Sequence, residues 1–182
     1  MKKLFCLMPV LLMGFAAHAQ NEPLVSFNAS QAEIIRIGML VLGGWAILNI
    51  VIGGFKLTKA SRSKKFFFQM SLYWNIVNLC IAGASLYTLL SEDVAVRTLA
   101  ESLQQHEFYK KILYLNIGLD VAYFFLGKYL QQRASLSAKT EQLQGWGSAI
   151  VLQGLFLFIL DLVLVVLLEG LAPQLFRLVA AS

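Results

Sequence analysis

Four long apolar runs constrain the fold of this chain more than any other feature. Each is longer than the roughly 20 residues that an α-helix needs to cross the hydrocarbon of a bilayer. Because lipid offers no hydrogen bonds to the backbone, each run that crosses it must be helical. Hydrophobic residues make up 58% of the chain and charged ones 14%, against about 25% charged residues in a soluble domain. We therefore predict an all-α polytopic membrane protein, a four-helix transmembrane bundle with spans at about 34–57, 66–90, 108–129 and 146–171.

The N-terminal segment has the layout of a cleavable signal peptide. Lys2 and Lys3 form a basic start, residues 4–17 are apolar, and Ala17-His18-Ala19 is a small-x-small cleavage site. The apolar part is too short to span a bilayer comfortably. We predict a signal peptide at 1–19 and a transmembrane domain at 20–182. An uncleaved first helix is the alternative.

The basic loops predict the orientation. Lys and Arg residues concentrate in cytoplasmic loops of membrane proteins. The loop after the third run carries Lys128, Arg133 and Lys139 against Glu141. We expect both basic loops in the cytoplasm, a bacterial inner-membrane location, and periplasmic termini in the mature protein. The formal charge of +5 therefore reflects topology, and no nucleic-acid partner is expected. The loop after the first run is the more basic one and holds Lys56, Lys59, Arg62, Lys64 and Lys65.

The loop after the second run has features of its own. Val96, Leu99 and Leu103 recur at helical spacing, which predicts a short amphipathic helix on the outer membrane surface. An extension of the second transmembrane helix is the alternative. By residue count, Arg36 and Glu169 lie at similar heights at the outer edge, and we expect them to pair.

Polar and small residues recur inside the runs at steps of three and four. Such a step marks the seam of a packed bundle. Small residues let helices approach closely, and amides can bond across helices. We expect these stripes to face one another while large apolar residues face lipid. The clearest stripe, in the second run, is Ser71, Asn75, Asn78, Ala82 and Ser85.

Seven of these polar residues are candidates for function or for packing. Counting along each helix at about 1.5 Å per residue divides them into two layers. Neither layer contains Lys, Arg or His, and an isolated carboxylate in low dielectric tends to be neutral. We expect Asp120 to be protonated and to donate to an amide oxygen. One layer, about 10–14 Å deep, holds Asn49, Asn75, Asp120 and Gln153; the other, about 18–22 Å deep, holds Asn78, Asn116 and Asp161.

The functional prediction is a non-enzymatic structural or accessory subunit. The sequence holds no nucleophile–base pair and no metal-ligand set, so no catalytic residue, metal or cofactor is predicted. A small proton-coupled carrier or channel, acting as an oligomer through Asp120, is the alternative, because intramembrane acids often mark proton or substrate paths. The expected partners are the lipid bilayer and, in an oligomer, a second copy or another membrane protein.

Four stretches carry a resemblance to a known family. They read GMLVLGGWAILNIVIGG at 38–54, YWNIVNLCIAG at 73–83, LNIGLDVAYFFLG at 115–127 and GWGSAIVLQG at 145–154. Together they resemble a family of small bacterial four-helix membrane proteins of unknown function. The resemblance covers most of the chain after the predicted signal peptide. It implies the architecture and brings no activity, substrate or cofactor.

Overall fold

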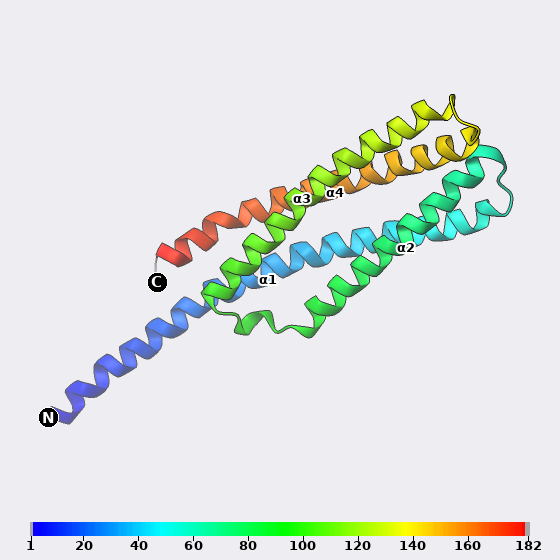
Figure 1. The fold of residues 1–182 in the computed structure, drawn as a ribbon. Helices are drawn as coiled ribbons and strands as arrows, with labels where there is room; N and C mark the ends of the chain where they lie inside the picture. The colour runs from blue at the N-terminus through cyan, green and yellow to red at the C-terminus, as the bar shows by residue number, and fades with distance from the viewer. Residues whose placement is uncertain (1, 181–182) are drawn as a thin grey trace.

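The protein is entirely helical in the part of the chain that the structure describes. The computed structural model describes the backbone of residues 2–180 and the side chains of residues 22–180. Helices α1 and α2 form one antiparallel hairpin, and α3 and α4 form a second (Figure 1). The elements are α1 (Lys2–Leu57), α2 (Arg62–Ser91), the short 3₁₀ helix η1 (Val94–Val96), α3 (Leu99–Ala134) and α4 (Thr140–Ala180).

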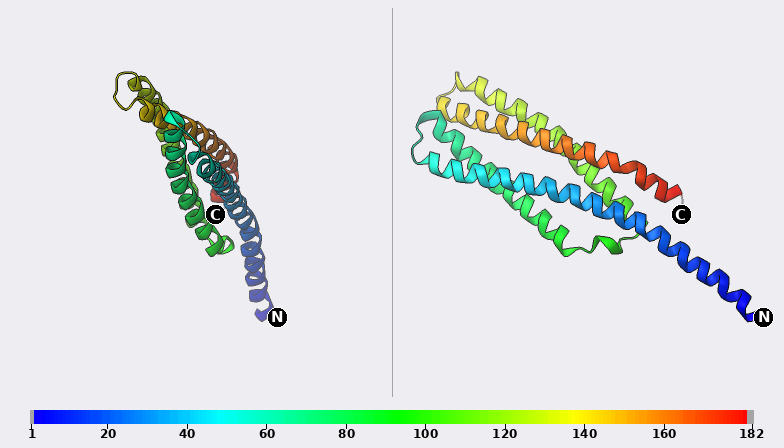
Figure 2. Two further views of the ribbon diagram at one scale, coloured as in Figure 1. Left: turned by 90° about the vertical axis from the view of Figure 1, so that its right-hand side faces the viewer. Right: turned by 180° about the vertical axis from the view of Figure 1, so that it is seen from behind.

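The two hairpin turns lie at the same end of the bundle. Seen from behind, the α1–α2 turn and the α3–α4 turn sit close together, and η1 links the hairpins at the far end (Figure 2). The first part of α1 extends beyond the other helices at that far end (Figure 1). An apolar cluster of Ile35, Leu113, Leu164, Val165 and Leu168 joins α1, α3 and α4.

Three helical segments in the described chain are long and apolar enough to cross a membrane: Glu22–Leu57, Arg62–Ser91 and Thr140–Ala180. The predicted spans at 34–57, 66–90 and 146–171 fall inside them. Helix α3, with 36 residues, is long enough but less apolar, since it carries charges such as Lys110 and Asp120. The prediction of an all-helical chain with four long helices is confirmed. The fourth crossing, at 108–129, stays a prediction.

Two glycines bring α3 and α4 into close contact. A Cβ atom on Gly127 would lie 2.7 Å from the carbonyl oxygen of Gly147, and one on Gly147 would lie 2.5 Å from that of Gly127. Further along, a Cβ on Gly154 would lie 3.1 Å from the carbonyl oxygen of Asp120. Glycine at these positions allows the two backbones to approach closely, which is how membrane helices commonly associate.

The loop between α2 and α3 differs from both expectations. Leu99 and Leu103 lie in the first turns of α3, so the structure has neither a separate surface helix nor an extension of α2. Helix α3 begins at Leu99 because Thr98 and Glu101 form a capping box, in which each side chain accepts a hydrogen bond from the other residue's backbone N–H. Val96 ends η1.

The predicted signal peptide, residues 1–19, falls where the structure describes the backbone alone. That backbone is helical through the expected cleavage site after Ala19 and continues into the rest of α1. The side chains of this segment, and Met1, lie outside the described residues. The signal peptide therefore stays a prediction.

Candidate functional site

A groove separates α2 from α3, although these helices follow each other in the chain. Each packs against another helix, α2 on α1 and α4, and α3 chiefly on α4, and in the described chain the backbones of α2 and α3 do not come close to each other. The space between them is a pocket of about 720 Å³. It runs from Met70 to Leu89 along α2 and from Gln105 to Tyr123 along α3, and α1 and α4 also contribute to its lining.

The rim of the groove is apolar and open. Val77 of α2 is 57% exposed and Leu119 of α3 is 41% exposed, and both line the groove. The rings of Trp74 and Tyr123 meet edge to face across it, with centroids 4.9 Å apart, on the side of the hairpin turns. The groove therefore opens sideways, between two helices, in the direction where lipid would lie around a membrane protein.

The inner wall of the groove is polar. It holds four of the seven candidates: Asn78 from α2, Asn116 and Asp120 from α3, and Asp161 from α4. Asn116 interacts with the carboxyl of Asp161, and the two carboxyls are near enough to interact electrostatically. The four residues span both predicted layers, so the division into two layers does not describe this site. The groove brings together residues whose side chains line it, whereas counting residues along each helix gives only their depth.

Two buried polar atoms in this wall have no hydrogen-bond partner. They are Nδ2 of Asn78 and Oδ2 of Asp120, and their residues are 4% and 3% exposed. The expected hydrogen bond from Asp120 to an amide oxygen is therefore not formed among the described residues. Because an unpaired polar group is costly in an apolar setting, the wall offers one free donor and one free acceptor to a molecule in the groove.

The other three candidates lie outside the groove and serve packing. Nδ2 of Asn49 donates to the carbonyl oxygen of Trp45 at 2.9 Å, and Nδ2 of Asn75 to that of Ser71 at 2.8 Å. Both bonds stay within one helix, whereas bonds across helices were expected. A short Asn side chain readily reaches the carbonyl one turn back, and this local bond competes with a bond to another helix.

Gln153 makes a hydrogen bond between helices, outside the groove. Its Oε1 accepts from Nε1 of Trp45 at 2.9 Å, and the Trp45 ring stacks on Phe156 with centroids 4.1 Å apart. Gln153 is fully buried. This contact fastens α1 to α4 and leaves the groove free.

A second polar cluster, missed by the sequence analysis, lies near the start of α3. His106 is 1% exposed, and its Nδ1 lies 2.9 Å from Oε1 of Gln31 on α1. Its ring also contacts Phe27, and the neighbouring Asn28 is fully buried. Burial, and then the positive charge of Lys110, lower the pKa of His106. The available signal was that His106 is the one histidine beyond the predicted signal peptide.

The predicted pair of Arg36 and Glu169 is wrong. Arg36 pairs instead with Glu33, one turn away on its own helix, at 2.6 Å. Glu169 pairs with Nζ of Lys110 at 3.0 Å and accepts a hydrogen bond from the hydroxyl of Tyr114 at 3.1 Å. Similar height along two helices is not enough for a contact, and α3 lies closer to α4 along this stretch.

The arrangement has the chemistry of a binding site. No Lys, Arg or His lines the groove, and no group of three possible metal-ligating side chains occurs among the residues described. What the groove offers is an apolar channel with amides and carboxyls on its inner wall. Such a surface can hold an uncharged molecule with a polar head, and its carboxyls can exchange protons.

Fold and site together define a class: all-helical proteins with membrane-span-like helices and a polar-walled groove on one side. Residues 41–162 match a family of unknown function, DUF6992, and the chain belongs to that family. The expected resemblance to a family of unknown function is thereby confirmed. The matched range includes all seven polar candidates and His106. Comparison with curated proteins and with solved structures found no match.

Proposed function

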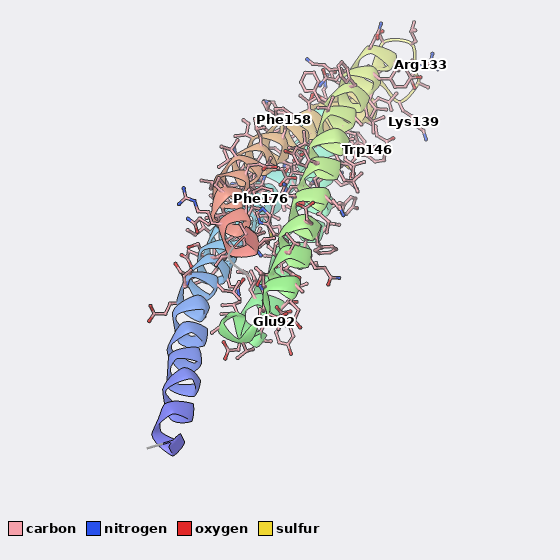
Figure 3. The ribbon with its side chains drawn as sticks, turned by 90° about the vertical axis from the view of Figure 1, so that its left-hand side faces the viewer. Glu92, Arg133, Lys139, Trp146, Phe158 and Phe176 are labelled. Atoms are coloured by element: carbon pink, nitrogen blue, oxygen red, sulfur yellow. The ribbon has the colours of Figure 1, made fainter. Side chains whose placement is uncertain are left out.

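We propose that this protein is an integral protein of a bacterial inner membrane that crosses the bilayer four times after removal of its signal peptide. Both basic turns lie at one end of the bundle, with Arg133 and Lys139 there and Glu92 at the other end (Figure 3). That arrangement suits a cytoplasmic end rich in Lys and Arg. Helix α3 can cross because it packs along α4 through Gly127 and Gly147, which shields part of its surface.

In that membrane the protein acts as a non-enzymatic accessory subunit that binds an apolar molecule in the groove between α2 and α3. The observation that carries this proposal is the pairing of an open apolar rim with the unpartnered Asn78 and Asp120 on the inner wall. Binding needs only such a surface. Catalysis would need reacting groups held in a defined geometry.

The second candidate is a proton-coupled carrier. It is favoured by Asp120 and Asp161, two acids that share one groove near the middle of the predicted spans. Four helices alone enclose little aqueous space, so a carrier would act as an oligomer. In this candidate Asp120 is the group that takes up and releases protons.

Proton flux separates the two candidates. The purified protein is reconstituted into liposomes that contain a pH-sensitive dye, and a pH gradient is applied. An accessory subunit gives the same flux as empty liposomes. Flux above that level, abolished by Asp120→Asn in a protein that melts at the same temperature, would establish the carrier instead, because Asn preserves the shape but cannot release a proton.

A further inference from the structure

The two unpartnered atoms of the groove specify the polar head of a ligand. Nδ2 of Asn78 can donate a hydrogen bond and Oδ2 of Asp120 can accept one. Both atoms are buried, and both residues line the groove. A ligand that satisfies both carries an oxygen that accepts from Asn78 and a hydroxyl that donates to Asp120.

The charges of the groove restrict the ligand further. Among the described residues, its lining holds the acids Asp120 and Asp161 and no basic residue. A phosphate head would lose its hydration there without gaining a cation to pair with. The head is therefore uncharged, which excludes the common anionic phospholipids.

The walls favour a flat ring with a hydrocarbon tail. Trp74 and Tyr123 stand edge to face at one end of the groove. Tyr73, Phe108 and Tyr109 add three more aromatic rings to its lining. Aromatic side chains pack well on a planar ring. Between Trp74 and Tyr123 at one end and Phe108 and Tyr109 at the η1 end, the wall is aliphatic and includes Ile81 and Ile112.

We propose that the groove between α2 and α3 binds an isoprenoid quinone. This inference rests on the proposed function, in which the groove binds an apolar molecule. Its ring lies beside Trp74 and Tyr123, where Asn78 donates to a ring carbonyl. In the reduced form, a ring hydroxyl donates to Asp120. The isoprenoid tail follows the aliphatic wall toward η1 and leaves through the open rim into the bilayer. The volume of about 720 Å³ lies within the usual range of small-molecule sites.

Binding is tested on the full chain, purified in detergent, by native mass spectrometry with three probes. They are a ubiquinone with two isoprene units, a dioleoyl diacylglycerol and a dioleoyl phosphatidylglycerol. We expect one quinone per chain and weaker binding of both lipids. Diacylglycerol also has carbonyl and hydroxyl groups but no planar ring. Its stronger binding would overturn the quinone proposal in favour of a neutral lipid.

Two pairs of variants locate the site. Ser85→Phe fills the groove away from the polar wall, whereas Ala84→Phe adds the same bulk on an exposed neighbour that does not line it. Asn78→Leu removes the donor, whereas Asn49→Leu alters an amide outside the groove. We expect Ser85→Phe and Asn78→Leu to weaken quinone binding about tenfold or more, and their partners to leave it unchanged. Melting temperatures identify variants that fail to fold, and Ser85→Phe does not depend on the buried polar wall.

Equal quinone binding by Ser85→Phe and the unaltered chain would overturn the proposal. The proposal would also be overturned if the unaltered chain formed a dimer without bound quinone and the Ser85→Phe variant were a monomer. A second copy of the chain would then occupy the groove. If the quinone does not bind, the accessory-subunit proposal still stands, because that proposal is tested separately by the proton flux in liposomes.

Discussion

At the scale of single residues, the glycines of the α3–α4 contact show how closely two helices can depend on a missing side chain. Gly147 faces both the carbonyl oxygen of Gly127 and the side chain of Gln131. Gly118, on the same α3 helix as Gly127, has nothing within 4 Å of the position a Cβ would take. Similar residues in similar runs thus carry different constraints.

Gly147→Ala should destabilise the protein by roughly 1–3 kcal/mol, the usual cost of overpacking. The new Cβ would lie 2.5 Å from the oxygen of Gly127 and 2.9 Å from Cγ of Gln131, so the helices must move apart. The measurement is the melting temperature in detergent, with Gly118→Ala as the matched control that should not lower it. Equal melting of the two variants would contradict the close contact.

His106 should make stability depend on pH. Its lowered pKa means that the unfolded chain binds a proton at a higher pH than the folded one. Stability therefore declines as pH falls through the ordinary His value of about 6.5. Lys110 strengthens this effect and the acids Glu107 and Glu169 oppose it.

The check compares melting temperatures at pH 8 and pH 5.5 for the unaltered protein and for His106→Gln, which cannot take up a proton at that position. Between pH 8 and pH 5.5, the melting temperature of the unaltered protein should fall more than that of His106→Gln. An identical decrease in both proteins would mean that other groups cause the pH dependence.

Much of the burial pattern could be predicted from the sequence, but the hydrogen bonds could not. The buried residues of α2 are Ser71, Asn75, Asn78 and Ala82, all members of the predicted stripe, because helical periodicity alone determines which residues share a face. The partner of each polar group depends on rotamers and on short distances. For this reason Asn75 bonds to its own helix and Arg36 to a neighbour on α1.

At the scale of elements, the start of α3 depends on a local motif. Thr98 accepts from the backbone of Glu101, whose carboxylate accepts from the backbone and hydroxyl of Thr98. The sequence Thr-x-x-Glu is a recognised signature of a helix start. It marks this boundary directly, whereas the apolar spacing of Val96, Leu99 and Leu103 could not distinguish a separate helix from the beginning of a long one.

Thr98→Ala should fray the first turn of α3 at a cost of about 1 kcal/mol, typical for the loss of an N-cap. Hydrogen exchange of the amides at 99–103 should speed up severalfold while the middle of α3 is unaffected. Thr58→Ala, at the turn between α1 and α2, is the control and should leave these amides unchanged. Unaltered exchange in Thr98→Ala would show that tertiary contacts alone fix the start of the helix.

At the scale of the whole molecule, the arrangement of the helices was partly predictable. Four apolar runs, with short basic turns after the first and the third, predict two hairpins, and the structure has them. The groove could not be predicted. The groove arises because α3 packs on α4 and stays apart from α2. The hydrophobic periodicity of α2 and α3 does not indicate that these two helices are separated. A linker from Glu92 to Thr98 is long enough to permit it.

The topology proposal predicts that a reporter fused after Arg62 is cytoplasmic and one fused after Glu101 is periplasmic. The reason is the cluster of basic residues at the hairpin turns. Paired fusions of a phosphatase and a fluorescent protein at each position provide internal controls. Mass spectrometry of the purified protein should find an N-terminus near Gln20. The reverse pattern of fusions would invert the orientation of every helix.

The packing of α3 along α4 also bears on how the cell builds this protein. An acidic residue near the centre of a helix, as Asp120 is in α3, makes the insertion of that helix alone into lipid costly. Its glycine surface, however, matches a strongly apolar partner that is synthesised immediately afterwards. In the proposed topology, α4 would therefore have to be synthesised before α3 could leave the insertion machinery. The second hairpin, rather than the single helix, would then be the unit of insertion.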